Sequence, residues 1–244
     1  MKLPRINLQK LVGNRFAVGF AVWLCQTLPP SLAYPLASLI ARIITLNKKS
    51  EMARAVRANQ WVISGERMSK KELNRLVYAT FRTNIGCLYD YYHNLNHPER
   101  VTDMVKMDES FTALFPEGFA HPPAALFVMP HLSNFDLAGR ALALSGLKFQ
   151  VLSYPQPPSG YQFANQLRAI EGMEVTPMSL SAVQQARTRL KQGGLVLTGL
   201  DRPLEDTRYF PRFFNRPAHV PVGYIQLALQ AKVPVYVEIG RAHV

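Results

Sequence analysis

A histidine and an aspartate five residues apart are the first residues whose types and spacing point to chemistry. His131 follows an apolar run at 124–129, and Asp136 comes after Ser133 or Asn134, either of which can cap a helix. Near neutral pH an imidazole can accept a proton, and a carboxylate can fix its tautomer. The pattern His131-x4-Asp136 therefore predicts a general base with a carboxylate partner. A structural histidine at a strand end is the alternative.

The elements that would position these residues form a β/α alternation. Strands are predicted at 124–129, 149–153, 173–177, 195–199 and 233–237, and helices at 134–146, 160–171, 179–192 and 221–231. This order predicts an α/β fold with a mostly parallel β-sheet core flanked by helices. Ligands gather at the carboxyl ends of such strands. We expect His131, Asp201 and Arg202 to meet at that edge.

The first part of the chain is predicted to be helical. Within the 244 residues, we expect a membrane-associating helical region at 1–100 and an α/β core at 101–237, in one domain overall. Ser69-Lys-Lys-Glu72 is a capping box that opens a helix with an apolar face.

The basic charge is concentrated in the same N-terminal region. Residues 1–100 carry 15 Lys and Arg against 5 Asp and Glu, whereas residues 101–244 carry 13 against 11. Two apolar stretches, at 16–25 and 32–46, follow Lys2, Arg5, Lys10 and Arg15. We expect two basic amphipathic helices that lie on an anionic membrane surface.

Two other interpretations of this region are possible. The two helices could instead pack on the core, or the start could be a signal peptide with a cleavage site at Ser31-Leu-Ala33. Nucleic acid is not an expected partner, because no recognised nucleic-acid motif appears.

Histidine and cysteine usage predicts no metal site. His93 and His97 have the spacing of two metal ligands on a helix, but no partner motif is near. Cys25 and Cys87 form no redox or metal motif and are expected to be buried thiols. Two cysteines give no disulfide framework, which favours a chain that faces the cytoplasm.

Several sequence blocks carry a family resemblance. After His131-x4-Asp136 come Asn165-Gln-Leu-Arg168-x3-Gly172, Gly199-Leu-Asp201-Arg202, Phe213-Phe214-x3-Ala218 and Pro221-x-Gly223. This order resembles the lysophospholipid acyltransferase superfamily, and within it the branch of the lipid A late acyltransferases and phosphatidylinositol mannoside acyltransferases. The block at Asp201 differs from the Glu-Gly-Thr-Arg of the glycerol-phosphate enzymes, which favours the glycolipid branch.

The resemblance implies an O-acyltransferase at the cytoplasmic face of the inner membrane. It would move a fatty acyl group from acyl-CoA or acyl-carrier protein to a hydroxyl of a glycolipid or lysophospholipid, without a cofactor. His131 would be the general base, and Asp136 would hold it and balance its charge. The candidate substrate-binding residues are Asn134, Arg168, Asp201 and Arg202.

Alternatives remain for these residues and for the function. Arg168 could be an exposed helix charge, and Asp201 and Arg202 could pair with each other or cap a turn. Phe213-Phe214 could belong to the core, touch a membrane or line an acyl chain. The rival functions are a non-catalytic lipid- or nucleic-acid-binding protein and a hydrolase in which His131 activates water.

The last seven residues, 238–244, match one reading frame of a common sequencing adapter. We expect them to be non-native, with the native chain continuing past Val237.

Overall fold

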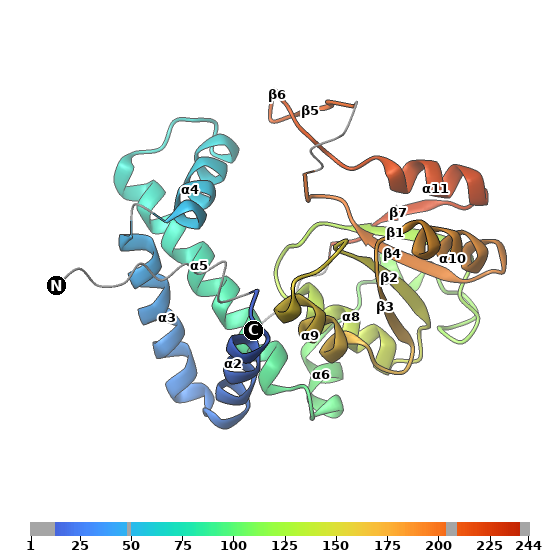
Figure 1. Cartoon of the computed structure of the whole chain (residues 1–244), viewed down its shortest axis with the longest axis horizontal. Coiled ribbons are helices and arrows are strands. Elements are labelled where there is room, and N and C mark those ends of the chain that lie inside the picture. The colour runs from blue at the N-terminus through green and yellow to red at the C-terminus, as the bar shows by residue number, and fades with distance from the viewer. Residues whose placement is uncertain (1–12, 48–49, 204–208, 240–244) are drawn as a thin grey trace.

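The computed structural model describes residues 13–47, 50–203 and 209–239. Figure 1 shows a group of N-terminal helices standing beside a layered α/β core. The helices are α2 (Arg15–Thr27), α3 (Pro30–Leu46), α4 (Glu51–Ile63), α5 (Lys70–His93), α6 (Pro98–Met104) and α7 (Glu109–Thr112). The described residues contain no helix that is both long and apolar enough to cross a membrane.

Helix α5 is the centre of the N-terminal group, since α2, α3 and α4 all pack against it. The predicted capping box is present: the Ser69 side chain accepts from the Glu72 backbone N–H, and the Glu72 carboxylate accepts from the Ser69 backbone N–H. These two bonds satisfy donors that a helix start otherwise leaves unpaired. The apolar face of α5 buries Val77 and Phe81 against Ala41 of α3 and Ala53 of α4.

The core is a five-stranded parallel sheet, which confirms the predicted α/β class. Its strands are β1 (Ala125–Met129), β2 (Phe149–Ser153), β3 (Met173–Pro177), β4 (Leu195–Gly199) and β7 (Val235–Val237), in the order β3-β2-β4-β1-β7. The helices of the core are α8 (Phe135–Leu144), α9 (Ser159–Arg168), α10 (Leu180–Lys191) and α11 (Gly223–Ala231).

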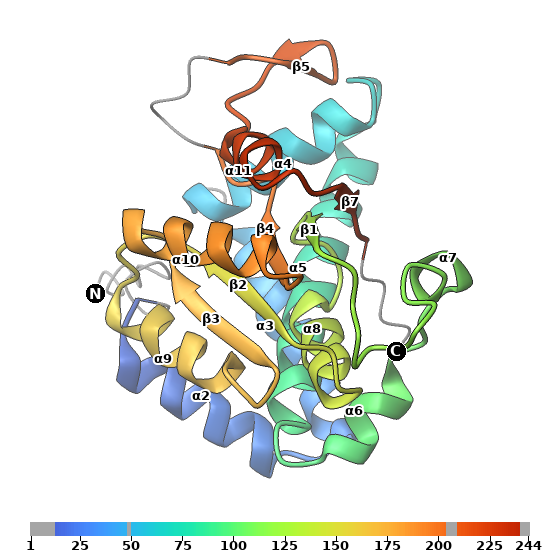
Figure 2. The same ribbon diagram turned by 90° about the vertical axis from the view of Figure 1, so that its right-hand side faces the viewer.

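Helices cover both faces of the sheet, as parallel strands require. Phe127 and Phe149 pack with Leu142 of α8 and Phe111 of α7 on one face. On the other face, α10 and α11 pack against Leu126 and Val128, and Figure 2 shows α10 lying across the strands. Strand β1 is buried along its whole length, which explains why its sequence is continuously apolar.

Helix α2 joins the two parts of the molecule. Its Val22 packs with Tyr91 of α5, Leu137 of α8 and the partly buried Phe163 of α9. The α/β core and the N-terminal helices therefore share one apolar cluster.

Helices α6 and α7 were not predicted from the sequence, and neither was a hairpin. Strands β5 (Arg212–Phe213) and β6 (Arg216–Pro217) form an antiparallel hairpin inside the connection between β4 and α11. Several predicted elements are also shorter than expected: β7 covers only Val235–Val237, α8 covers Phe135–Leu144, and α11 begins at Gly223.

Candidate active site

The carboxyl ends of β1 and β4 bring His131 and Asp201 together. The two strands are hydrogen-bonded neighbours, and Met129, the last residue of β1, pairs with Gly199, the last residue of β4. His131 and Asp201 each follow two residues after these paired ends. The parallel register therefore places them side by side, although they are 70 residues apart in the chain.

Asp201 holds His131 through two hydrogen bonds. Nδ1 of His131 lies 2.6 Å from Oδ1 of Asp201, and the backbone N–H of His131 donates to Oδ2 at 2.8 Å. A carboxylate can only accept, so Nδ1 carries the proton and Nε2 keeps its lone pair. The two side chains are 29% and 35% exposed. The pair is thus an oriented imidazole whose basic nitrogen is Nε2.

The ionisation of Asp201 fits this arrangement. Burial by itself raises the pKa of Asp201, but the hydrogen bonds and charge of His131 outweigh it, so the pKa of the carboxyl lies below its ordinary value. At neutral pH Asp201 is an anion that can stabilise a protonated His131.

A strained turn presents the histidine. The Leu132 backbone N–H donates to the Pro130 carbonyl at 2.8 Å, and Ser133 has a left-handed φ of 52°. Such a conformation costs a non-glycine residue about 1–2 kcal/mol. Strained backbone of this kind is concentrated at functional sites. The Phe135 ring then meets the imidazole edge to face, 4.8 Å between centroids, and restricts its rotation.

Gly199 leaves the space that the imidazole occupies. A Cβ built on Gly199 would lie 2.7 Å from Cε1 of His131 and 3.5 Å from its Nδ1. Any side chain here would push the ring away from Asp201. The sequence blocks included Gly199 only as a neighbour of Asp201, and this positioning role becomes visible only once β1 and β4 are side by side.

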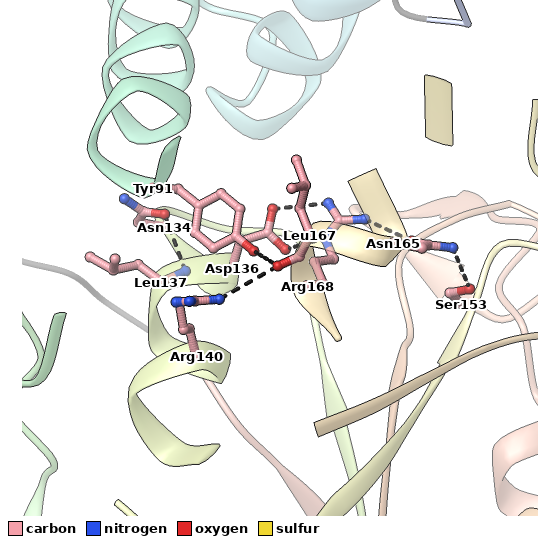
Figure 3. Close-up of polar contacts among 9 residues, drawn as sticks. All are labelled: Tyr91, Asn134, Asp136, Leu137, Arg140, Ser153, Asn165, Leu167 and Arg168. Carbon is pink, nitrogen blue, oxygen red and sulfur yellow. Dashed lines mark hydrogen bonds and ion pairs between the residues drawn. The ribbon is translucent and has the colours of Figure 1, made fainter. Parts of the chain in front are cut away.

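The expected pairing of His131 with Asp136 is wrong. Both carboxylate oxygens of Asp136 accept from Arg168, with Oδ1 2.7 Å from Nε and Oδ2 2.9 Å from Nη2, as Figure 3 shows. Asp136 lies in the first turn of α8, where its charge also suits the helix dipole. Burial lowers the pKa of Arg168, but the Asp136 charge and hydrogen bonds outweigh this effect and raise it.

Arg168 is held on its other side as well. Its Nη1 donates to Oδ1 of Asn165 at 3.1 Å, and Nδ2 of Asn165 donates to Oγ of Ser153 at 3.1 Å. These bonds tie the end of α9 to α8 and to β2. Arg168 is therefore not the exposed helix charge that the sequence left open, and its role in acceptor binding stays a prediction.

Asn134 is also used inside the protein. Its side chain accepts from the Leu137 backbone N–H and donates to the Cys87 carbonyl of α5 at 3.0 Å. The residue is only 3% exposed. Asn134 thus caps α8 and links it to α5, and its substrate contact stays a prediction.

Arg202 extends the site on its solvent side. Its guanidinium carbon lies 5.7 Å from the centre of the Tyr154 ring and 5.9 Å from that of Tyr161. The residue is exposed, and Asp201 beside it is engaged with His131. Among the described residues no ion pair joins these two neighbours, and Arg202 presents its positive charge at the Tyr154 and Tyr161 rings.

The remaining histidine and cysteine candidates have local roles. His93 Nδ1 contacts the Cys25 carbonyl at 2.8 Å, and the His93 ring stacks on Tyr89. Cys25 and Cys87 are half-buried free thiols, and burial raises the pKa of Cys25 to about 11. Across the described residues, no three His, Cys, Asp or Glu side chains are grouped to hold a metal ion.

Comparison with known proteins gives one finding. No curated protein sequence matches the chain significantly. A family model described as bacterial lipid A biosynthesis acyltransferase matches residues 4–237, which is nearly the whole chain. The protein thus belongs to the bacterial lipid A biosynthesis acyltransferase family and is an acyltransferase of lipid biosynthesis.

Proposed function

We propose that this protein is a membrane-surface O-acyltransferase in which His131 is the general base and Asp201 its carboxylate partner. The donor is an acyl thioester, either acyl-CoA or acyl-carrier protein, and the acceptor is a hydroxyl of a glycolipid or lysophospholipid. The observation that carries the proposal is the His131–Asp201 pair at the ends of two adjacent parallel strands.

The pair can perform the transfer without a covalent intermediate. Nε2 of His131 takes the proton of the acceptor hydroxyl while its oxygen attacks the thioester carbonyl. When the tetrahedral intermediate collapses, the C–S bond breaks and the thiolate takes the proton back from the imidazolium. Asp201 stabilises that imidazolium through the Nδ1–H bond, as the third member of a catalytic triad does.

Arg202 supports an anionic substrate in the same site. Its guanidinium lies over two tyrosine rings, and the residue directly follows Asp201 in the chain. A fixed guanidinium suits a phosphate group, because its N–H donors match phosphate oxygens. Both the acceptor glycolipid and the donor carriers contain phosphate, so Arg202 is the candidate contact for either.

The N-terminal helices support a lipid surface as the place of reaction. Helix α2 exposes Phe16, Phe20 and Trp23 at helical spacing, opposite the face that packs on α9. Helix α3 exposes a second stripe, Leu32, Leu39, Ile43 and Leu46. Aromatic and aliphatic stripes beside basic residues are typical of interfacial helices.

The basic side of this surface is only partly described. Arg15 lies over the Phe163 ring, 5.5 Å from its centre, and Arg42 belongs to α3. Lys2, Arg5 and Lys10 lie outside the described residues. We propose that the surface faces anionic lipids at the cytoplasmic side of the inner membrane.

An acyl-transfer assay tests the function. Purified protein is incubated with radiolabelled acyl-CoA or acyl-carrier protein and a bacterial lipid extract, with His131→Ala alongside. We expect labelled lipid from the wild type and a loss of about 10²–10⁴-fold in the variant. Free fatty acid without labelled lipid would show a hydrolase, and no turnover of either donor would favour a lipid-binding protein.

Vesicle sedimentation tests the location separately. We expect the protein to sediment with vesicles that contain phosphatidylglycerol, and less with vesicles of phosphatidylcholine alone, because salt-sensitive attraction adds to apolar insertion. Equal binding to the two kinds of vesicle, unchanged by added salt, would contradict the proposal of an anionic lipid surface.

A further inference from the structure

The β5–β6 hairpin holds two aromatic residues at its turn. Phe213 and Arg216 pair across the strands, so Phe214 and Asn215 form a two-residue loop. Both loop residues have positive φ, 49° and 59°, the pattern of a type I′ turn. Asparagine and glycine are the residues that prefer such positions, whereas phenylalanine does not. The turn therefore keeps an aromatic ring where local conformation disfavours one.

The aromatic side chains of the hairpin are exposed. Phe210, Phe213 and Phe214 are 51%, 64% and 48% exposed, and none of them belongs to an apolar cluster among the described residues. The rings of Phe213 and Phe214 pack edge to face, with centroids 4.7 Å apart. This observation removes the interpretation of Phe213-Phe214 as core. Contiguous exposed apolar side chains mark an interaction site.

The charge of the hairpin limits the kind of partner. Arg212 and Arg216 flank the two phenylalanines, and residues 209–219 contain no Asp or Glu. Arginines beside aromatic rings suit the boundary between lipid phosphates and acyl chains. The hairpin also protrudes, and Figures 1 and 2 show it extending beyond the five-stranded sheet. A protruding pair of aromatic side chains can insert into a lipid layer, because lipids can move apart around them.

The hairpin is anchored beside its turn, whereas its two phenylalanines are exposed. Arg216 forms an ion pair with Glu66, which follows α4 in the N-terminal helical group. The hairpin also lies in the β4–α11 connection, the same segment that carries Asp201 and Arg202. The hairpin and the residue that hydrogen-bonds to His131 therefore belong to one connection.

We propose that the β5–β6 hairpin is a second lipid-contacting element, which inserts Phe213 and Phe214 into an anionic lipid surface while Arg212 contacts its phosphates. The proposal rests on the membrane-surface location proposed above and adds a contact apart from α2 and α3.

Depth-dependent quenching tests the insertion. The reporter is Phe214→Trp in a Trp23→Phe, Trp61→Phe background, which keeps the aromatic character of α2. Vesicles contain phosphatidylglycerol and phosphatidylcholine brominated on the acyl chains. We expect strong quenching of this tryptophan. The matched control is Leu180→Trp in the same background, at an 86% exposed position on α10, and we expect it to remain unquenched.

Two substitutions then test the contribution to binding. Phe214→Asn removes the ring and places a favoured residue in the turn, so a loss of binding cannot come from a weakened hairpin. Combined with Phe213→Thr, it is expected to weaken vesicle binding at least about tenfold, since two aromatic contacts are lost. Leu180→Thr is the control and should leave binding unchanged.

The outcomes separate this proposal from the one on which it rests. Vesicle binding without quenching at residue 214, or without loss in the double variant, would overturn the hairpin proposal and leave α2 and α3 as the lipid contacts. Tighter binding of acyl-carrier protein to the wild type than to the double variant, without lipid quenching, would overturn it in favour of a protein partner. No vesicle binding by the wild type would overturn both proposals.

Discussion

Asp136 and Arg168 form a two-hydrogen-bond ion pair between the start of α8 and the end of α9. The side chains are 12% and 23% exposed, so water screens the pair only weakly. The pair lies next to the turn that presents His131 but uses neither nitrogen of that histidine. In this structure the aspartate of the His-x4-Asp pattern pairs with Arg168, and Asp201 hydrogen-bonds to the histidine.

This role predicts a loss of stability when the pair is broken. Asp136→Asn leaves the Arg168 charge without its partner in a partly buried place, which should cost about 1.5–3 kcal/mol. In a chain of this size each kcal/mol lowers the melting temperature by roughly 2–4 °C. Thermal unfolding checks the value. Adding Arg168→Gln to Asp136→Asn should restore part of the loss, and simple additivity of the two single changes would contradict the pairing.

Gly199 should be intolerant of even the smallest side chain. Gly199→Ala places a Cβ 2.7 Å from the present position of His131 Cε1, so the imidazole must move. A displacement of about 1 Å at a catalytic group can cost about 10²-fold in rate. We expect that loss in kcat, with the melting temperature little changed. Gly223→Ala, where no atom lies within 4 Å, is the control; equal activity of the two variants would refute the steric argument.

Asp90 should make stability depend on pH. It is 3% exposed and accepts from the Tyr34 hydroxyl at 2.7 Å. Burial raises the pKa of Asp90, against the opposing effects of the Tyr34 hydrogen bond and the His93 charge. A carboxyl whose pKa is raised in the folded state is destabilising once it ionises, so stability should fall as pH rises through that raised value.

Asp90→Asn isolates this effect, because the amide can still accept from Tyr34 and does not titrate. The difference in melting temperature, variant minus wild type, should increase as pH rises above the ordinary carboxyl value of about 4. A difference that stays constant between pH 4 and pH 8 would show that Asp90 does not titrate in this range.

The sequence predicted the elements better than the contacts between them. Strands such as 125–129 are continuous apolar runs between breakers, and the capping box at Ser69 is a local signal, so both could be read directly. The carboxylate partner of His131 could not be identified from the sequence, because sequence spacing favoured the nearby Asp136. Only the register of Met129 with Gly199 reveals that Asp201 is closer.

The β5–β6 hairpin is a second feature that could not be predicted from the sequence. Its turn, Phe214-Asn215, lacks the Asn-Gly or Asp-Gly pair that predicts a hairpin with a type I′ turn. The sequence therefore placed no strand at 212–217. The sequence left a core, a membrane-touching and an acyl-lining role open for Phe213 and Phe214, and their exposure argues against the core.

The most direct test of the central claim compares Asp201→Asn with Asp136→Asn in the acyl-transfer assay, at a temperature where both variants are folded. The structure predicts that Asp201→Asn lowers kcat by about 10²–10⁴-fold with little change in KM, because the His131 tautomer and the stabilisation of its protonated form are lost. Asp136→Asn should keep kcat within about tenfold of the wild type. The opposite order, with Asp136→Asn as inactive as His131→Ala and Asp201→Asn near wild type, would contradict the account.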